Sequence, residues 1–160
     1  MAKKIKSNLV LGVLALALAV TCGLSVYSPI RFDKQRSIRE HAVKERLIKI
    51  RYAEEKYRMA NGVYADDFNT LVKGGYLADS LQYIPFTDNK QFSLATTVQT
   101  GKSGRQTPLM ECGAEYKEYL SGLDVNSVSN LTEEANNAGR YPGLKIGDLT
   151  TPNDNAGNWE

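Results

Sequence analysis

The sequence predicts an α+β protein in which an N-terminal transmembrane helix continues into an amphipathic stem helix packed on a small antiparallel sheet. Three observations predict it: an uncharged apolar run over residues 9–27, a helical apolar stripe within residues 32–60, and short β-like segments between residues 81 and 120. A chain of 160 residues holds one modest domain and an appendage. We divide it into a cytoplasmic tail (1–8), a transmembrane anchor (9–28), an amphipathic stem helix (29–61) and an extracytoplasmic head (62–160).

The apolar run is long enough for a membrane span, because a helix needs about 20 apolar residues to cross a bilayer core. Two other interpretations stay open. The run is a signal peptide cleaved after Ala19, or a lipoprotein signal modified at Cys22, although Thr21 suits the position before such a cysteine poorly. The lysines of the leading tail favour a cytoplasmic N-terminus. The anchor interpretation predicts a single-pass inner-membrane protein with a periplasmic head.

Charge is strongly segregated along the chain, although the formal net charge is only +2. Residues 31–58 contain ten Lys/Arg and five Asp/Glu, whereas residues 59–160 contain seven and thirteen. In the stem the basic residues alternate with glutamates at helical spacing, which is typical of a solvated helix face rather than a nucleic-acid-binding surface. The lipid bilayer is therefore an expected partner and nucleic acid is not.

The stem helix is expected over residues 32–60, after Ser28-Pro29 ends or kinks the anchor. Its apolar residues recur every three or four positions, which predicts one buried face. Asn61-Gly62 is expected to stop it. The stripe is formed by Val43, Leu47, Ile50, Ala53, Tyr57 and Ala60.

The head is expected to begin with a short helix capped by Asp66, with Phe68, Leu71 and Val72 buried. Three or four strands should follow, at residues 81–86, 91–98, 107–114 and 115–120, with a turn at "TGKSGR". A helix over residues 124–138 should bury Val125, Val128, Leu131 and Ala135. The Gly/Pro/Asn-rich end reads as a loop, and Trp159 indicates that this tail is pinned to the body.

No catalytic constellation occurs in the sequence, so we expect a protein without enzymatic activity. His41 is interpreted as an exposed stem residue and Cys112 as a small buried hydrophobe. Asp66-Asp67 is interpreted as a cap and a surface acid, and Glu54-Glu55 as acids of an ordinary helix face. Two cysteines and one histidine exclude the usual zinc spacings, and no cofactor motif is present.

The residue types leave one ligand-binding site possible. Asp148, Asn153, Asp154 and Asn155, followed by Asn158, offer oxygen ligands of the kind calcium prefers. The alternative is a polar loop held by local turns, since the spacing does not match an EF-hand.

The order of these features resembles the pilin-like proteins, most closely the major pseudopilins of type II secretion. Ala53, Tyr57, Gly62 and Tyr64 resemble the step that ends their stem helix, and residues 71–77, with Leu71, Gly75 and Tyr76, resemble the "L…L…G-Y-L" that follows. Gly157, Asn158 and Trp159 resemble their closing "G-N-W", beside which that family has a calcium loop. The prepilin peptidase motif of that family does not occur before Leu9.

The resemblance implies a structural subunit that acts with like subunits, or with other envelope components, in a secretion or pilus-type assembly. The alternative is a monomeric membrane-tethered or lipoprotein adaptor that does not polymerise. An anchored hydrolase, the third class considered, has no candidate residues.

Overall fold

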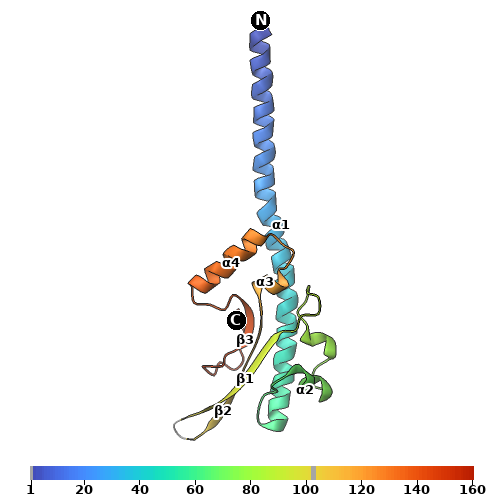
Figure 1. Ribbon diagram of the computed structural model, residues 1–160, viewed down its shortest axis with the longest axis vertical. Coiled ribbons are helices and arrows are strands. Elements are labelled where there is room, and N and C mark those ends of the chain that lie inside the picture. The colour runs from blue at the N-terminus through green and yellow to red at the C-terminus, as the bar shows by residue number, and fades with distance from the viewer. Residues whose placement is uncertain (1, 102–103) are drawn as a thin grey trace. The chain divides into compact units, whose positions relative to one another are not determined.

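The computed structural model describes the backbone of residues 2–101 and 104–160, and the side chains of residues 9–21, 30–101 and 104–160. The chain forms two compact units, residues 1–36 and residues 37–160, which are described separately. One helix, α1 (Ala2–Asn61), contributes to both (Figure 1).

The first unit consists of the N-terminal part of α1, in which the side chains of residues 9–21 are exposed. Among the described residues, no helix has the length and apolar character that a membrane span requires. The predicted anchor, residues 9–28, lies partly outside the side chains that the structure describes. Helix α1 continues through Ser28-Pro29, because a proline removes only its own N–H from the helical ladder.

The second unit contains a three-stranded antiparallel sheet in the order β1-β2-β3. The strands are β1 (Ser93–Thr100), β2 (Gln106–Glu115) and β3 (Gly143–Gly147). Four short elements accompany them: α2 (Phe68–Lys73), the 3-10 helix η1 (Asp79–Gln82), α3 (Tyr116–Tyr119) and α4 (Val125–Asn137). The predicted α+β class and the small antiparallel sheet are therefore confirmed.

The core forms between the stem part of α1 and one face of the sheet (Figure 1). On the sheet side, alternate residues of β2 and their partners in β3 are buried, as the period of two of a strand requires. On the helix side the predicted stripe is buried as far as Ala53, whereas Tyr57 is half-buried and Ala60 is exposed. The principal core residues are Val43, Leu47, Ile50, Met110, Cys112, Ala114 and Ile146.

Two predicted strands are wrong. Residues 81–86 form the end of η1 and a single bridge between Tyr83 and Gln91, because Pro85 lacks a donor and Phe86 has a φ of 63°. Residues 115–120 form no strand of their own: Glu115 ends β2, and α3 follows it. The Glu115 carboxylate accepts from the backbone of Glu118, and the Glu118 carboxylate accepts from the backbone of Glu115, which is a capping box that starts a helix.

Other boundaries differ in detail. The cap of α2 is Asp67, not Asp66: its carboxylate accepts the Thr70 N–H at 2.7 Å. Helix α4 is confirmed with Asp124 as its cap, but Val125 is 79% exposed rather than buried. Strand β3 lies in the tail that we predicted to be a loop, and its pairing with β2 is its source of order.

Gly147 offers a test of this β2–β3 packing. A Cβ at this position would lie 2.1 Å from the Met110 carbonyl oxygen, and the residue has a φ of +72°. We expect Gly147→Ala to lower the free energy of unfolding by roughly 2–4 kcal/mol in denaturant titration. Gly139→Ala is the matched control, because Gly139 also has a positive φ but open space around it, and should cost only about 1 kcal/mol. Equal losses would contradict the close approach.

Candidate functional site at the junction of the stem helix and the head

The stem helix ends where the resemblance placed its step. Gly62 has a φ of +81°, and its N–H donates to the Arg58 carbonyl at 2.8 Å. The ring of Tyr57, on the last turns of α1, meets the ring of Tyr76 edge to face, with centroids 5.4 Å apart. The two segments of the head motif are thus in direct contact at the end of the helix.

The "GYL" segment turns sharply after α2. Leu71 is fully buried, and its carbonyl accepts the N–H groups of Tyr76 (2.9 Å) and Leu77 (3.2 Å). Gly75 has a φ of +73°, which a residue with a side chain rarely adopts. This turn closes α2 and brings Tyr76 back toward α1.

Tyr64 connects the junction to the C-terminal tail. It is buried, and its hydroxyl accepts a hydrogen bond from the Asn155 side-chain amide at 2.7 Å. The Arg58 guanidinium lies over the Tyr64 ring, 5.1 Å from its centroid. Two segments 91 residues apart are therefore joined by one buried hydrogen bond.

The last residues of the chain lie against the stem, so the expectation of a pinned tail is confirmed. The Arg51 guanidinium pairs with the Glu160 carboxylate at 2.9 Å, and the Lys44 ammonium lies 5.6 Å from the centre of the Trp159 ring. The Trp159 ring packs on Gly157, where a Cβ would be 2.6 Å from it. We call residues 155–160 the tail clasp.

Three stem arginines bind backbone carbonyls of the head, which the sequence interpretation of a solvated basic face missed. Arg39 donates to the carbonyls of Tyr119 (2.9 Å) and Ser121 (2.8 Å). Arg46 donates to those of Ser80 and Tyr83, and Arg51 to that of Asn155. Part of the basic charge of the stem thus fastens the head to the helix.

Glu54 is a buried carboxylic acid in the middle of this junction. One of its oxygens accepts the Ala65 N–H at 2.9 Å, and the other has no hydrogen-bond partner among the described residues. Burial, with a further contribution from the Asp66 charge, raises the pKa of Glu54 to about 7, although the Ala65 N–H acts in the opposite direction. The Glu54 charge also contributes to raising the pKa of the buried Cys112 thiol.

The sequence interpretation of Glu54 as an ordinary helix-face acid is wrong. A signal for its burial was present: Glu54 follows Ile50 by four residues and Leu47 by seven, which places it on the buried stripe. Because acids are rarely fully buried without a partner, the sequence pattern favours Ala53 rather than Glu54 as the stripe residue after Ile50.

Two of the predicted calcium ligands, Asp148 and Asn155, make hydrogen bonds within the head. The Asp148 carboxylate accepts hydrogen bonds from the Thr150 hydroxyl and from the N–H groups of Thr150 (2.7 Å) and Thr151 (3.0 Å). The bond from the hydroxyl, followed by those from the N–H groups, lowers the pKa of Asp148 to about 2. Asn155 donates to Tyr64, and Asn153 and Asp154 are exposed. Asn158 bonds to the backbone of β3 through Lys145 and Gly143. No group of three or more His, Cys, Asp or Glu able to hold a metal occurs among the described residues.

The remaining candidates for chemistry are far from a catalytic arrangement. His41 is exposed on α1, 3.5 Å from Glu45. Cys112 is fully buried in β2, and desolvation raises the pKa of its thiol well above the ordinary value, which keeps the thiol protonated. Asp67 caps α2 and Asp66 is exposed. Cys22 lies outside the described side chains.

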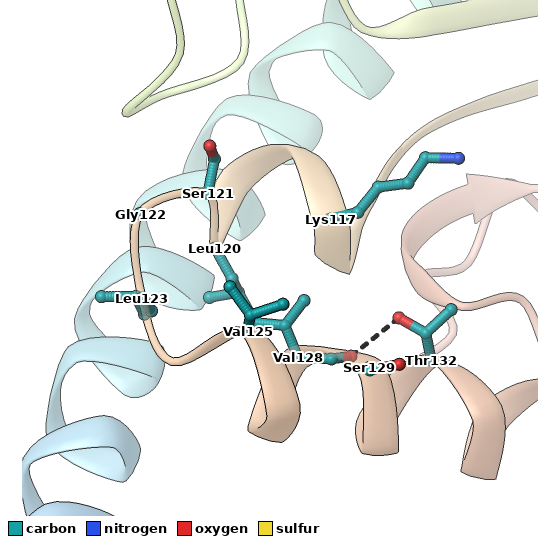
Figure 2. A pocket seen from close by; sticks show the side chains of 9 residues that line it. All are labelled: Lys117, Leu120, Ser121, Gly122, Leu123, Val125, Val128, Ser129 and Thr132. Carbon is teal, nitrogen blue, oxygen red and sulfur yellow. Dashed lines mark hydrogen bonds between the residues drawn. The ribbon is translucent and has the colours of Figure 1, made fainter.

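A surface pocket of about 380 Å³ lies between α3 and α4. Figure 2 shows the side chains of Leu120, Val125 and Val128 gathered in it, with the Lys117 chain directed away from them. The Lys117 ammonium pairs with Glu115 at 2.6 Å, and the Thr132 hydroxyl donates to the Val128 carbonyl. The pocket presents apolar surface without an acid–base pair, so it offers contact area rather than chemistry.

Comparison of the chain with models of protein families, with curated proteins and with solved structures finds no match.

Glu54 predicts a specific pH dependence of stability. Because its pKa in the folded protein is about 7 and its ordinary value is 4.5, the folded state holds the proton more tightly than the unfolded chain. Its contribution is therefore greatest below pH 4.5 and is lost as pH rises to about 7, by about 3 kcal/mol in all. We expect the difference in unfolding free energy between the wild type and Glu54→Gln to shift by that amount, toward the variant, from pH 4 to pH 8.

Glu54→Leu serves as a second variant that cannot titrate, and it should give the same pH-dependent difference on a different constant offset. Denaturant titrations at closely spaced pH values measure both. Wild-type and variant curves that run parallel across this range would show that Glu54 is not buried as described.

Removal of the Tyr64 hydroxyl tests the Tyr64–Asn155 hydrogen bond. Tyr64→Phe leaves the buried Asn155 amide without an acceptor, so we expect the free energy of unfolding to fall by about 1–2 kcal/mol. Tyr52→Phe is the control, because Tyr52 is 57% exposed on α1 and should change stability by less than about 0.5 kcal/mol. An equally small effect at both positions would contradict the clasp.

The calcium prediction is tested by thermal melting. If the loop around Asp148 binds calcium, millimolar calcium raises Tm and a chelator reverses the rise. Asp148→Asn should abolish the shift. An identical Tm with calcium and with chelator removes the site.

Proposed function

We propose that this protein is a non-enzymatic, membrane-anchored structural subunit with a pilin-like or pseudopilin-like periplasmic head, acting in a secretion or pilus-type assembly of the cell envelope. The single observation that carries the proposal is the junction. There Tyr57 meets Tyr76, and Tyr64 bonds to Asn155, two residues before the tail segment that resembles the closing "G-N-W".

The proposed mechanism is mechanical. Residues 9–28 hold the subunit in the inner membrane, with the N-terminus in the cytoplasm, and the stem transmits position to the head. Support for this anchor comes from the uncharged sequence of residues 9–27 and from the lysines before it. A subunit of this kind needs a rigid connection between stem and head, which the arginine–carbonyl bonds and the tail clasp supply.

The surface left for neighbouring subunits lies on the outer side of α1. With the buried face turned to the sheet, a stripe of exposed residues follows the helix at intervals of three or four. It mixes charge with exposed apolar groups, including Tyr52 at 57% and Met59 at 81%. We assign lateral subunit contacts to this stripe, which consists of Glu45, Lys49, Tyr52, Lys56 and Met59.

Cross-linking in membranes tests the assembly. We expect chains with cysteines at both Glu45 and Lys56, in a Cys22→Ser background, to give a ladder of dimers, trimers and larger species with a bifunctional thiol reagent. Two sites per chain are needed because a single cysteine stops at the dimer. The matched pair at Ser129 and Glu133 on α4, which is also exposed, should remain monomeric.

A ladder from the stem pair alone supports a polymerising subunit. Monomer from both pairs would instead leave the second candidate, a membrane-tethered or lipoprotein adaptor that acts as a monomer. Mass spectrometry of the purified N-terminus distinguishes an uncleaved membrane anchor from a lipidated and from a cleaved N-terminus. An intact Met1 or Ala2 supports the anchor, an acylated Cys22 the lipoprotein, and a new amine after Ala19 cleavage.

A further inference from the structure

The two edge strands of the sheet, β3 and β1, differ in how far other segments cover them. Along β3 the tail covers the edge: Ile146 bridges to Gly157, the Asn158 N–H donates to the Lys145 carbonyl at 3.0 Å, and the Gly147 N–H to the Ala156 carbonyl at 3.0 Å. Along β1 only the start is covered, where the Phe92 N–H donates to the Gln82 carbonyl at 3.0 Å. From Leu94 to Thr100, the described backbone makes no hydrogen bond on the side away from β2.

A surface pocket of about 470 Å³ lies against this part of β1. Its lining includes Thr96, Thr97 and Val98 of β1, Pro108 of β2 and Tyr57 of α1. In Figure 1 the ends of β1 and β2 nearest their connecting turn extend away from the helices. Val98 on this stretch is 45% exposed, and its neighbours Gln99 and Thr100 are exposed too.

The edge also lacks the features by which proteins protect open strands. Soluble proteins blunt such edges with charged side chains, proline or bulges, because free N–H and C=O groups otherwise template pairing with another chain. Residues 91–101, "QFSLATTVQTG", contain neither charge nor proline. The other two strands do contain such residues, with Pro108 and Glu111 in β2 and Lys145 in β3.

We propose that the outer edge of β1, residues 94–100, pairs antiparallel with the same edge of a second copy, joining two three-stranded sheets into one. Pairing around a two-fold axis places a strand opposite itself, so its backbone donors and acceptors match automatically. A charged residue near the two-fold axis of such a pair would face its own copy and oppose pairing, and this strand has no charged residue. Thr96, Thr97 and Thr100 supply β-branched cross-strand partners, which favour pairing.

This contact is distinct from the lateral stem contacts proposed above and does not depend on them. An isologous edge pair closes at two copies, whereas lateral subunit contacts of a filament repeat without closing. The strand edge would therefore set a dimer of heads.

Single cysteines along the edge test the pairing in the purified full-length chain, in mild detergent and a Cys22→Ser background. Thr96→Cys, Thr97→Cys and Val98→Cys are oxidised in parallel with Ser129→Cys on α4. Because only residues near the two-fold axis face themselves, we expect one of the three positions to give disulfide-linked dimer at least fivefold faster than the α4 control. Thermal melting confirms that each variant is folded.

A charge variant provides the second arm. Val98→Lys places like charges opposite each other, and we expect it to reduce the dimer fraction in light scattering at least fivefold, whereas Asn130→Lys on α4 leaves the fraction unchanged. Equal cross-linking at the edge and at Ser129, or a dimer fraction insensitive to Val98→Lys, overturns the proposal. So does cross-linking of the edge cysteines to a different protein in membranes without the homodimer, which would assign the edge to another chain.

Discussion

The sheet of this protein depends on having one face covered, and the stem part of α1 covers it. A sheet that is apolar on one face has to bury that face against another element. Met110, Cys112 and Ile146 of the sheet are fully buried in this core. The helix in turn gains its buried stripe of Val43, Leu47 and Ile50 only from the same contact. Neither the sheet nor the stem helix can bury its apolar face alone, so the fold depends on the contact between them.

The tail clasp completes this arrangement from the far end of the chain. It covers the edge of β3 through Gly157 and Asn158, and it returns to α1 through Trp159 and Glu160. One short segment therefore protects a sheet edge and fixes the stem. Glu54 lies in the same junction. One of its oxygens has no hydrogen-bond partner in the part of the chain that the structure describes, and its pKa of about 7 makes the stability of the junction depend on pH.

Features set by local sequence could be predicted. The periodic stripe of α1, the break at Gly62 and the β1–β2 hairpin each follow from residues close together in the chain. Strand β3 could not be predicted. Only three residues stand between its two glycines, and they form a strand by pairing with β2, some thirty positions earlier. In residues 115–120 the alternation of the side chains suggested a strand, whereas the reciprocal Glu115–Glu118 bonds favoured a helix.

The candidate site divides in the same way. The residues that resemble the pilin-like step are brought together, since Tyr57 meets Tyr76 and Tyr64 meets the tail. The arginines Arg39, Arg46 and Arg51 escaped prediction because a basic helix residue that reaches a distant carbonyl looks, in sequence, the same as one in solvent. Glu54 escaped because a buried, half-satisfied acid is rare.

Hydrogen–deuterium exchange of the full chain, compared with a chain lacking residues 155–160, tests the central claim that the tail fastens the head to the stem. The account predicts faster exchange in β3 and in residues 62–67 when the clasp is absent, with exchange in α4 unchanged. Exchange that changes nowhere outside the missing residues would contradict it.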